Sequence, residues 1–231
     1  MKIIEFLKPG IVVQKNLNPV VWDSDSRIHA DVKEKLLIIA QHFKEYVEVD
    51  FPIIDVIITG GQTGKYYTEQ SDLDLHLVTD YDQIECDREL EELFQTKKTL
   101  YKKDFDISIK GIPVELYVED KKTPAVGGAY SLVNDKWIRM STSPKDPIDQ
   151  ELIDTQSEKL GKLISRAVVS NDLELLYKIK DFLQDYRRKG LKNQGEFGVA
   201  NLVFKTLRNS GILDQLKIKI KRLESDKLGL K

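Results

Sequence analysis

Residues 72–78 read DLDLHLV and alternate between polar and apolar side chains as far as position 77. A period of two is that of a β-strand, because successive side chains of a strand point to opposite faces of the sheet. The three leucines must therefore face a hydrophobic core, while Asp72, Asp74 and His76 share the other face. The pattern predicts a sheet with one buried face and one face that carries two carboxylates about 7 Å apart along the strand.

The first part of the chain mixes helices and strands around this segment. Apolar residues at helical spacing predict helices over 31–47 and 87–100. Short apolar or alternating segments predict further strands at 53–58, 106–109, 114–118, 131–133 and 136–138. The last four form two hairpins, because turn residues separate the members of each pair. Together these elements predict an α/β (α+β) domain in which helices and strands mix.

The pattern changes after residues 141–147, STSPKDP, because prolines and small polar residues resist both helix and strand. Beyond this linker, amphipathic stretches broken near Gly190, Gly195 and Gly211 predict helices at 149–169, 172–188, 197–209 and 212–223. The sign of the net charge changes at the same place. Residues 1–145 carry 19 basic and 25 acidic side chains, whereas residues 146–231 carry 17 basic and 13 acidic side chains. We therefore predict two domains, residues 1–145 and a C-terminal helical domain of residues 146–231.

The composition is that of a globular protein. Hydrophobic residues make up 41% of the 231 residues, and 36 basic against 38 acidic side chains give a net charge of -2. A protein that grips nucleic acid over its whole surface usually has a large basic excess. The single cysteine, Cys86, excludes an intramolecular disulfide, and no apolar run reaches the ~18 residues of a membrane helix. We predict a cytoplasmic protein with no membrane partner.

Asp72 and Asp74 are candidate metal ligands. Two like charges on one strand face repel each other and favour a bound cation. Oxygen-only ligands suit Mg²⁺ or Mn²⁺, which take their remaining ligands from water and phosphate. A solvated strand face is the simpler alternative. His76, on the same face, either supports a metal site or is a hydrogen-bonded strand histidine.

Two further features lie near these carboxylates in the sequence. Upstream, an apolar strand runs into Gly60-Gly61, a turn whose bare backbone allows close approach of a phosphate; the alternative is a plain tight turn. Downstream, Glu115 in the middle of the next hairpin is the candidate third carboxylate, with Asp106 and Glu119 as rivals.

In combination these residues resemble the DNA-polymerase-beta-like nucleotidyltransferase superfamily. Its signature is a hydrophobic strand ending in Gly-Gly or Gly-Ser, a spacer, two carboxylates that alternate with apolar residues, and a third carboxylate on a later strand. Residues 57–61 and 71–75 match that order. Segments 97–100, 114–118 and 130–137 look like predicted nucleotidyltransferases common in bacteriophage genomes. The resemblance covers roughly residues 15–140.

The resemblance implies the nucleotidyltransferase fold, which is a mixed sheet with flanking helices, and two divalent ions, Mg²⁺ or Mn²⁺, in each site. It implies transfer of a nucleoside monophosphate from a nucleoside triphosphate such as ATP, with release of pyrophosphate. Asp72 and Asp74 would bridge the two ions. Glu115 would hold the ion that activates the attacking group and is a candidate to accept its proton.

The resemblance also implies nucleotide contacts. Gly60 and Gly61 would cradle the triphosphate. Many relatives have serine where Gly61 stands, so a hydroxyl contact to phosphate is missing here. The candidates to replace that contact are Gln62, Thr63 and Lys65. Ser71 is a further candidate for contact with the nucleotide. The C-terminal helices supply candidates to meet triphosphate or base, each of which is alternatively a solvated helix face: Lys162, Arg166, Asn201, Lys205 and Arg208.

The acceptor is left open by the sequence. An RNA 3′ end, a protein hydroxyl and a small molecule are all compatible with the pattern. Basic clusters at 187–192 and 217–222 are candidates to attract an RNA end, and the alternative is that they only make the helices soluble. A phage-encoded enzyme would act in the host cytoplasm. The alternative function is a non-catalytic nucleotide-binding or protein-interaction module on the same fold.

Overall fold

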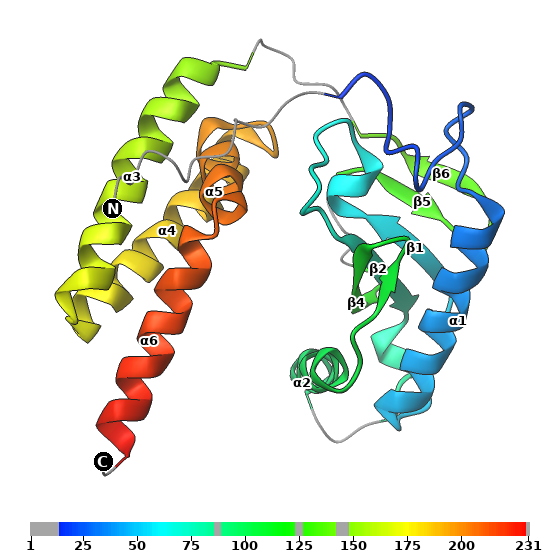
Figure 1. The fold of residues 1–231 in the computed structure, drawn as a ribbon. Helices are drawn as coiled ribbons and strands as arrows, with labels where there is room; N and C mark the ends of the chain where they lie inside the picture. Colours follow the sequence, from blue (N-terminus) through cyan, green and yellow to red (C-terminus); the bar gives the residue numbers. More distant parts are fainter. Residues whose placement is uncertain (1–13, 86–88, 123–126, 142–147, 230–231) are drawn as a thin grey trace. The chain divides into compact units, whose positions relative to one another are not determined.

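The computed structural model describes residues 14–85, 89–122, 127–141 and 148–229. These fall into two compact units, one that contains a sheet and ends at residue 141, and one that is helical and begins at residue 148 (Figure 1). The predicted domain boundary between residues 145 and 146 lies outside the described residues and stays a prediction. Cys86 also lies outside them.

The first unit is built on a mixed six-stranded sheet in the order β3-β4-β2-β1-β5-β6. Its strands are β1 (Asp55–Thr59), β2 (Leu73–Thr79), β3 (Ser108–Ile109), β4 (Ile112–Asp120), β5 (Ala129–Ser131) and β6 (Lys136–Arg139). β2 and β4 pair in parallel, whereas all other neighbours pair antiparallel. The predicted mixed sheet with flanking helices, followed by a helical region, is thus confirmed.

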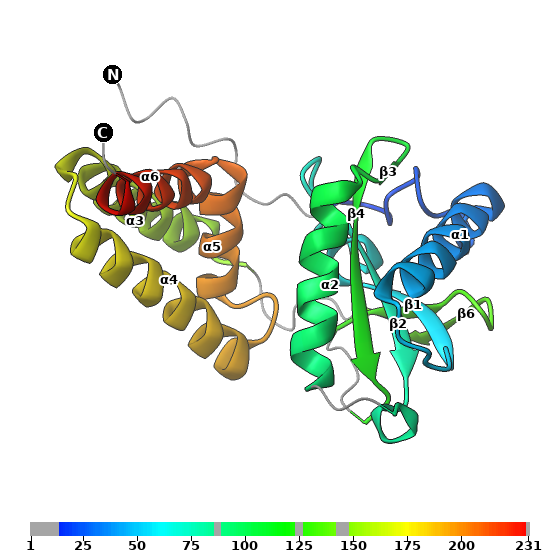
Figure 2. The same ribbon diagram turned by 90° about the horizontal axis from the view of Figure 1, so that it is seen from below.

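The strict alternation of β2 sets the inner and outer faces of the sheet. Leu73, Leu75 and Leu77 are fully buried and belong to one hydrophobic core with the apolar residues of β1 and β4. The helices α1 (Ala30–Val47) and α2 (Leu90–Asp104) contribute to the same core and touch each other there. α2 runs beside β4 (Figure 2). The alternate residues of β2 point to the opposite face, where Asp74 and His76 lie only partly buried.

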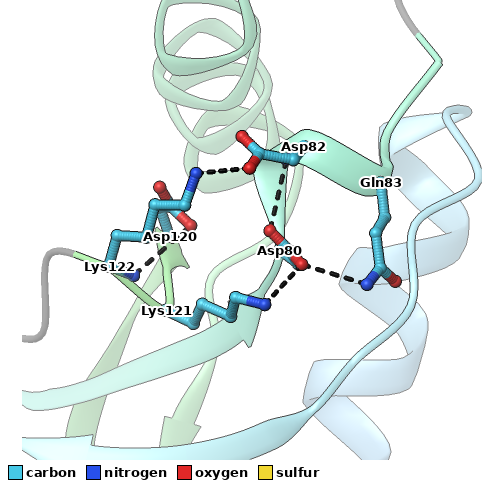
Figure 3. A network of polar contacts seen from close by, with 6 residues as sticks. All are labelled: Asp80, Asp82, Gln83, Asp120, Lys121 and Lys122. Atoms are coloured by element: carbon cyan, nitrogen blue, oxygen red, sulfur yellow. Dashed lines mark hydrogen bonds and ion pairs between the residues drawn. The ribbon is translucent and has the colours of Figure 1, made fainter.

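A polar network closes the carboxyl ends of the two parallel strands (Figure 3). The Asp80 carboxylate accepts a hydrogen bond from Lys121, and the backbone N–H of Asp82 and the amide of Gln83 donate to it at 3.3 and 3.0 Å. The hydrogen bond from Lys121 holds the pKa of Asp80 below its ordinary value. Asp82 in turn pairs with Lys122. The network therefore ties the loop that follows β2 to the end of β4.

The second unit contains α3 (Gln150–Ser170), α4 (Leu173–Gln194), α5 (Val199–Asn209) and α6 (Ile212–Leu228). Asp149 and Asp172 cap α3 and α4, each accepting a hydrogen bond from a backbone N–H of the first turn. α5 contacts each of the other three helices and buries both faces of its central turns. No helix among the described residues is both long and apolar enough to cross a membrane.

The sequence prediction that a helix ends at residue 188 is wrong, because α4 continues through Gly190 to Gln194. Glycine weakens a helix interior by about 1 kcal/mol relative to alanine, which is why it is expected to break one. Here α4 and α5 approach closely: a Cβ at Gly190 would lie 2.4 Å from the Cβ of Ala200. Packing against α5 therefore requires glycine and outweighs its poor helix propensity.

We predict that Gly190→Ala destabilises the helical unit by about 1–3 kcal/mol, because overpacking exceeds the gain in helix propensity. In a double-mutant cycle read by urea unfolding, adding Ala200→Gly should recover about 1 kcal/mol or more. Strictly additive effects of the two substitutions would contradict this account of the contact.

Candidate metal centre

Parallel pairing of β2 with β4 assembles three carboxylates on the polar face of the sheet. In the register of this pair Asp74 lies opposite Glu115, and Asp72 immediately precedes β2. One oxygen of each carboxylate lies within 4.8 Å of those of the other two, and all three residues are partly buried. The structure therefore brings together the three residues predicted from the sequence. Their catalytic role stays a prediction.

The two rival carboxylates lie elsewhere. Glu119 opposes Val78 in the strand register, and its Oε2 lies 2.6 Å from Nδ1 of His76. Asp106 is exposed in the segment between α2 and β3. Among the described residues neither belongs to the acidic cluster with Asp74.

His76 is a hydrogen-bonded strand histidine. Its Nε2 lies 3.0 Å from Oγ1 of Thr59 and its Nδ1 contacts Glu119, so both ring nitrogens have partners. Its ring also stacks on Tyr117, with the two ring centroids 4.5 Å apart. These contacts fix the side chain two residues after Asp74 and support the strand face that carries the cluster.

Gly60 brings the backbone of the preceding turn directly against Asp74. Its φ is +74°, in the left-handed region that favours glycine, and a Cβ there would lie 1.8 Å from Oδ2 of Asp74. A Cβ on Gly61 would instead meet only the side chain of Ser71, whose Oγ would lie 3.4 Å away. The absence of a side chain at Gly60 therefore makes room for the Asp74 carboxylate, a role that the sequence pattern alone does not reveal.

The side chains that follow Gly61 are engaged inside the protein. Gln62 is fully buried, where it accepts a hydrogen bond from Asn18 at 3.0 Å and donates one to the Ser71 carbonyl at 2.9 Å. Oγ1 of Thr63 donates to the Gly60 carbonyl at 2.7 Å. Both residues hold the shape of the turn, called η2 (Gly60–Thr63).

The remaining predicted nucleotide contacts are dispersed. Ser71 is buried beside the turn, where its Oγ accepts the Thr68 N–H at 2.9 Å, while Lys65 is exposed. Lys205 lies on α5 in the helical unit. In the same unit Asn201 is buried and accepts a hydrogen bond from Arg187, and Lys162 pairs with Glu158. Nucleotide-binding roles for these residues stay predictions.

Asn18 and Trp22 also support the turn, although no pattern in the sequence indicates that role. The indole N–H of Trp22 donates to the Gln62 carbonyl at 2.7 Å, and the Asn18 amide meets the Gln62 side chain. Both precede α1 and lie about forty residues from the turn, so no local pattern links them to it.

The sequence motifs also gave no functional role to two lysines of α2, Lys98 and Lys102. Lys102 pairs with Oε1 of Glu115, and Nζ of Lys98 lies 3.6 Å from its Oε2. Lys98 lies on the helix predicted over 87–100, and Lys102 lies just beyond its predicted end. Because α2 extends to Asp104, the two lysines, four residues apart, share one face, and only the fold shows which strand that face meets.

The carboxylates of the cluster differ in charge environment. Burial, together with the negative charges of Asp72 and Glu115, raises the pKa of Asp74 to about 6. Burial also acts to raise the pKa of Glu115, but hydrogen bonds from Lys102 and Tyr117 and the nearby lysine charges outweigh it and lower the pKa to about 2. The cluster thus combines a carboxyl group that resists ionisation with one that is strongly stabilised as the anion.

The donor set fits a hard divalent cation. All three side chains offer carboxylate oxygens, the ligands that Mg²⁺ and Mn²⁺ prefer. A Mg²⁺ ion holds each oxygen at ~2.1 Å and so spans at most ~4.2 Å between two ligands. The carboxylates would have to draw together from their 4.8 Å spread to share a single ion, and bridging carboxylates would let the cluster serve two.

Comparison with protein-family models, with curated proteins and with solved structures finds no match for this chain. What is established is therefore a mixed α/β fold with an acidic cluster formed by Asp72, Asp74 and Glu115, which could hold a metal ion.

We predict that Gly60→Ala abolishes binding of Mn²⁺, because the added methyl group must displace the Asp74 carboxylate. Circular dichroism should show that the sheet is retained, and isothermal titration with Mn²⁺ should show the loss of affinity. Gly61→Ala is the matched control and should bind Mn²⁺ like the wild type. Equal affinity of Gly60→Ala and the wild type would contradict the assigned contact.

A second prediction concerns Asp74 in EDTA. Its folded-state pKa of about 6 exceeds its ordinary 3.8, so the stability that neutral Asp74 contributes is full below about pH 4 and is lost as pH rises through about 6. Asp74→Asn cannot ionise. It should be more stable than the wild type by about 1–3 kcal/mol above pH 6, and equal to it near pH 4. Urea unfolding at both pH values measures this, and a difference independent of pH would refute it.

Proposed function

We propose that this protein is a metal-dependent nucleotidyltransferase that moves a nucleoside monophosphate from a nucleoside triphosphate to an acceptor and releases pyrophosphate. The observation that carries the proposal is the convergence of Asp72, Asp74 and Glu115 on the polar face of the sheet, with the Gly60 backbone held against Asp74. This is the arrangement that the sequence resemblance requires, with its elements in the same order along the chain.

Each residue has a distinct role in the proposed reaction. Asp72 and Asp74 would bridge two Mg²⁺ or Mn²⁺ ions, and Glu115, opposite Asp74, would bind on the side of the acceptor. The bound ions would supply charge neutralisation for the triphosphate and a lower pKa for the attacking hydroxyl group. Glu115 stays ionised to low pH, with its pKa near 2, and so is available as a ligand. Gly60 and Gly61 would offer backbone N–H groups to the phosphates.

The direct test is transfer of label from each α-labelled nucleoside triphosphate, with Mg²⁺ or Mn²⁺. RNA, a protein mixture and small compounds with hydroxyl groups should each be offered as the acceptor in parallel reactions. We predict that the wild-type protein transfers label and that Asp72→Asn/Asp74→Asn loses at least ~10³-fold in rate, or ~4 kcal/mol of transition-state stabilisation. Folding should survive, because repulsion between the two carboxylates is relieved.

Asp106→Asn provides the matched control, because it removes an exposed carboxylate near the end of α2 and should leave the rate unchanged. Wild-type rates in the double variant would refute the assigned site. Binding of triphosphate and metal without transfer to any acceptor would instead favour the non-catalytic nucleotide-binding module.

A further inference from the structure

The two lysines of α2 neutralise one side of the acidic cluster. Lys102 pairs with Oε1 of Glu115, while Nζ of Lys98 lies 3.6 Å from Oε2. The Tyr117 hydroxyl donates a hydrogen bond to that same Oε2 at 2.9 Å. Both oxygens of Glu115 are therefore engaged, and the engaging groups include two positive charges.

The other side of the cluster is different. Among the residues that the structure describes, none donates a hydrogen bond or forms an ion pair with the carboxylate of Asp72 or Asp74. A cation that approaches these two aspartates meets oxygen atoms that no described side chain contacts directly, although the Lys98 charge acts on Asp74 as well as on Glu115. A cation that approaches Glu115 must first displace ammonium groups that already hold it.

The two lysines differ in freedom to move. The Lys98 side chain is 18% exposed, and its ammonium group sits 3.3 Å from the centroid of the Tyr117 ring, in a cation–π contact. The Lys102 side chain is 65% exposed. Lys102 is therefore the freer of the two to swing into solvent on its flexible stem, and Lys98 is the more restrained.

We infer that Lys98 and Lys102 are internal counter-ions of Glu115, and that a bound polyphosphate draws them away and opens the Glu115 side of the cluster to a divalent ion. This inference rests on the proposed function and adds an order of binding to it: the polyphosphate binds before the divalent ion on the Glu115 side. Without a polyphosphate, the free protein binds a divalent ion through Asp72 and Asp74 alone.

Electrostatics favours this exchange. A single carboxylate balances only one of the two lysine charges, whereas a triphosphate offers several negative charges and many acceptor oxygens. When the lysines turn to phosphate, Glu115 loses its counter-ions beside two other carboxylates. Like-charge repulsion then raises the affinity of that side for a cation. The lysines therefore link arrival of the triphosphate to completion of the metal site.

The first experiment counts Mn²⁺ ions by electron paramagnetic resonance titration of the full chain without polyphosphate. The wild type should bind one ion tightly and a second ion only weakly. Lys98→Met/Lys102→Met should bind the second ion with at least about tenfold higher affinity than the wild type binds its second ion. Lys97→Met/Lys103→Met is the control, because it removes the same charge from the same helix. Lys97 pairs with Glu48 instead of the cluster, so this control should match the wild type.

The second experiment needs no metal. In EDTA, titration with inorganic tripolyphosphate should show that Glu115→Gln binds about tenfold more tightly than the wild type, because its lysines are released. Lys98→Met/Lys102→Met should lose this binding. Asp106→Asn, which removes the same charge nearby, should not reproduce the gain.

The outcomes separate the two proposals. Wild-type Mn²⁺ binding that Lys98→Met/Lys102→Met leaves unchanged, or tripolyphosphate affinity that Glu115→Gln leaves unchanged, would overturn the inference alone. Absence of Mn²⁺ binding by both the wild type and the lysine variant would overturn the proposed metal site, and with it the inference.

Discussion

The candidate site depends on the parallel pairing of β2 with β4. This register places Asp74 beside Glu115, and the alternation of both strands sends the two carboxylates to the same face. A shift by one residue would bury the carboxylates and expose the leucines, so the hydrophobic core that fixes the register also fixes the site. The polar network around Asp80 and Lys121 secures the other end of the same strand pair.

Three carboxylates held this closely are unfavourable without opposing charge. The protein balances them unevenly, since α2 supplies lysines to Glu115, while burial and the neighbouring charge of Asp72 raise the pKa of Asp74. Gly60 packs bare backbone against the same carboxylate and so limits its ability to move away. Such an arrangement stores repulsion that a divalent cation would relieve, which is the physical basis of the proposed function.

The turn after β1 shows what the Gly-Gly motif does inside the protein. The Gly-Gly pair predicted close approach of backbone to a ligand, and the structure reveals close approach of Gly60 to Asp74. Gln62 and Thr63, predicted as phosphate contacts, use their polar groups to fix this turn through Asn18 and the Gly60 carbonyl. A buried polar side chain needs partners, and the fold supplies them from the protein itself.

The sequence by itself determined which stretches form most of the strands and helices, though not all of their ends, and the shared face of Asp72 and Asp74, because these follow from periods of 2 and 3.6 residues that act over short distances. It also indicated Glu115 as the third carboxylate. Only the tertiary structure decided that Lys98 and Lys102 neutralise Glu115, and that α4 continues through Gly190 to pack on Ala200. Those contacts join segments distant in the chain, and their partners are chosen by how the elements pack rather than by local pattern.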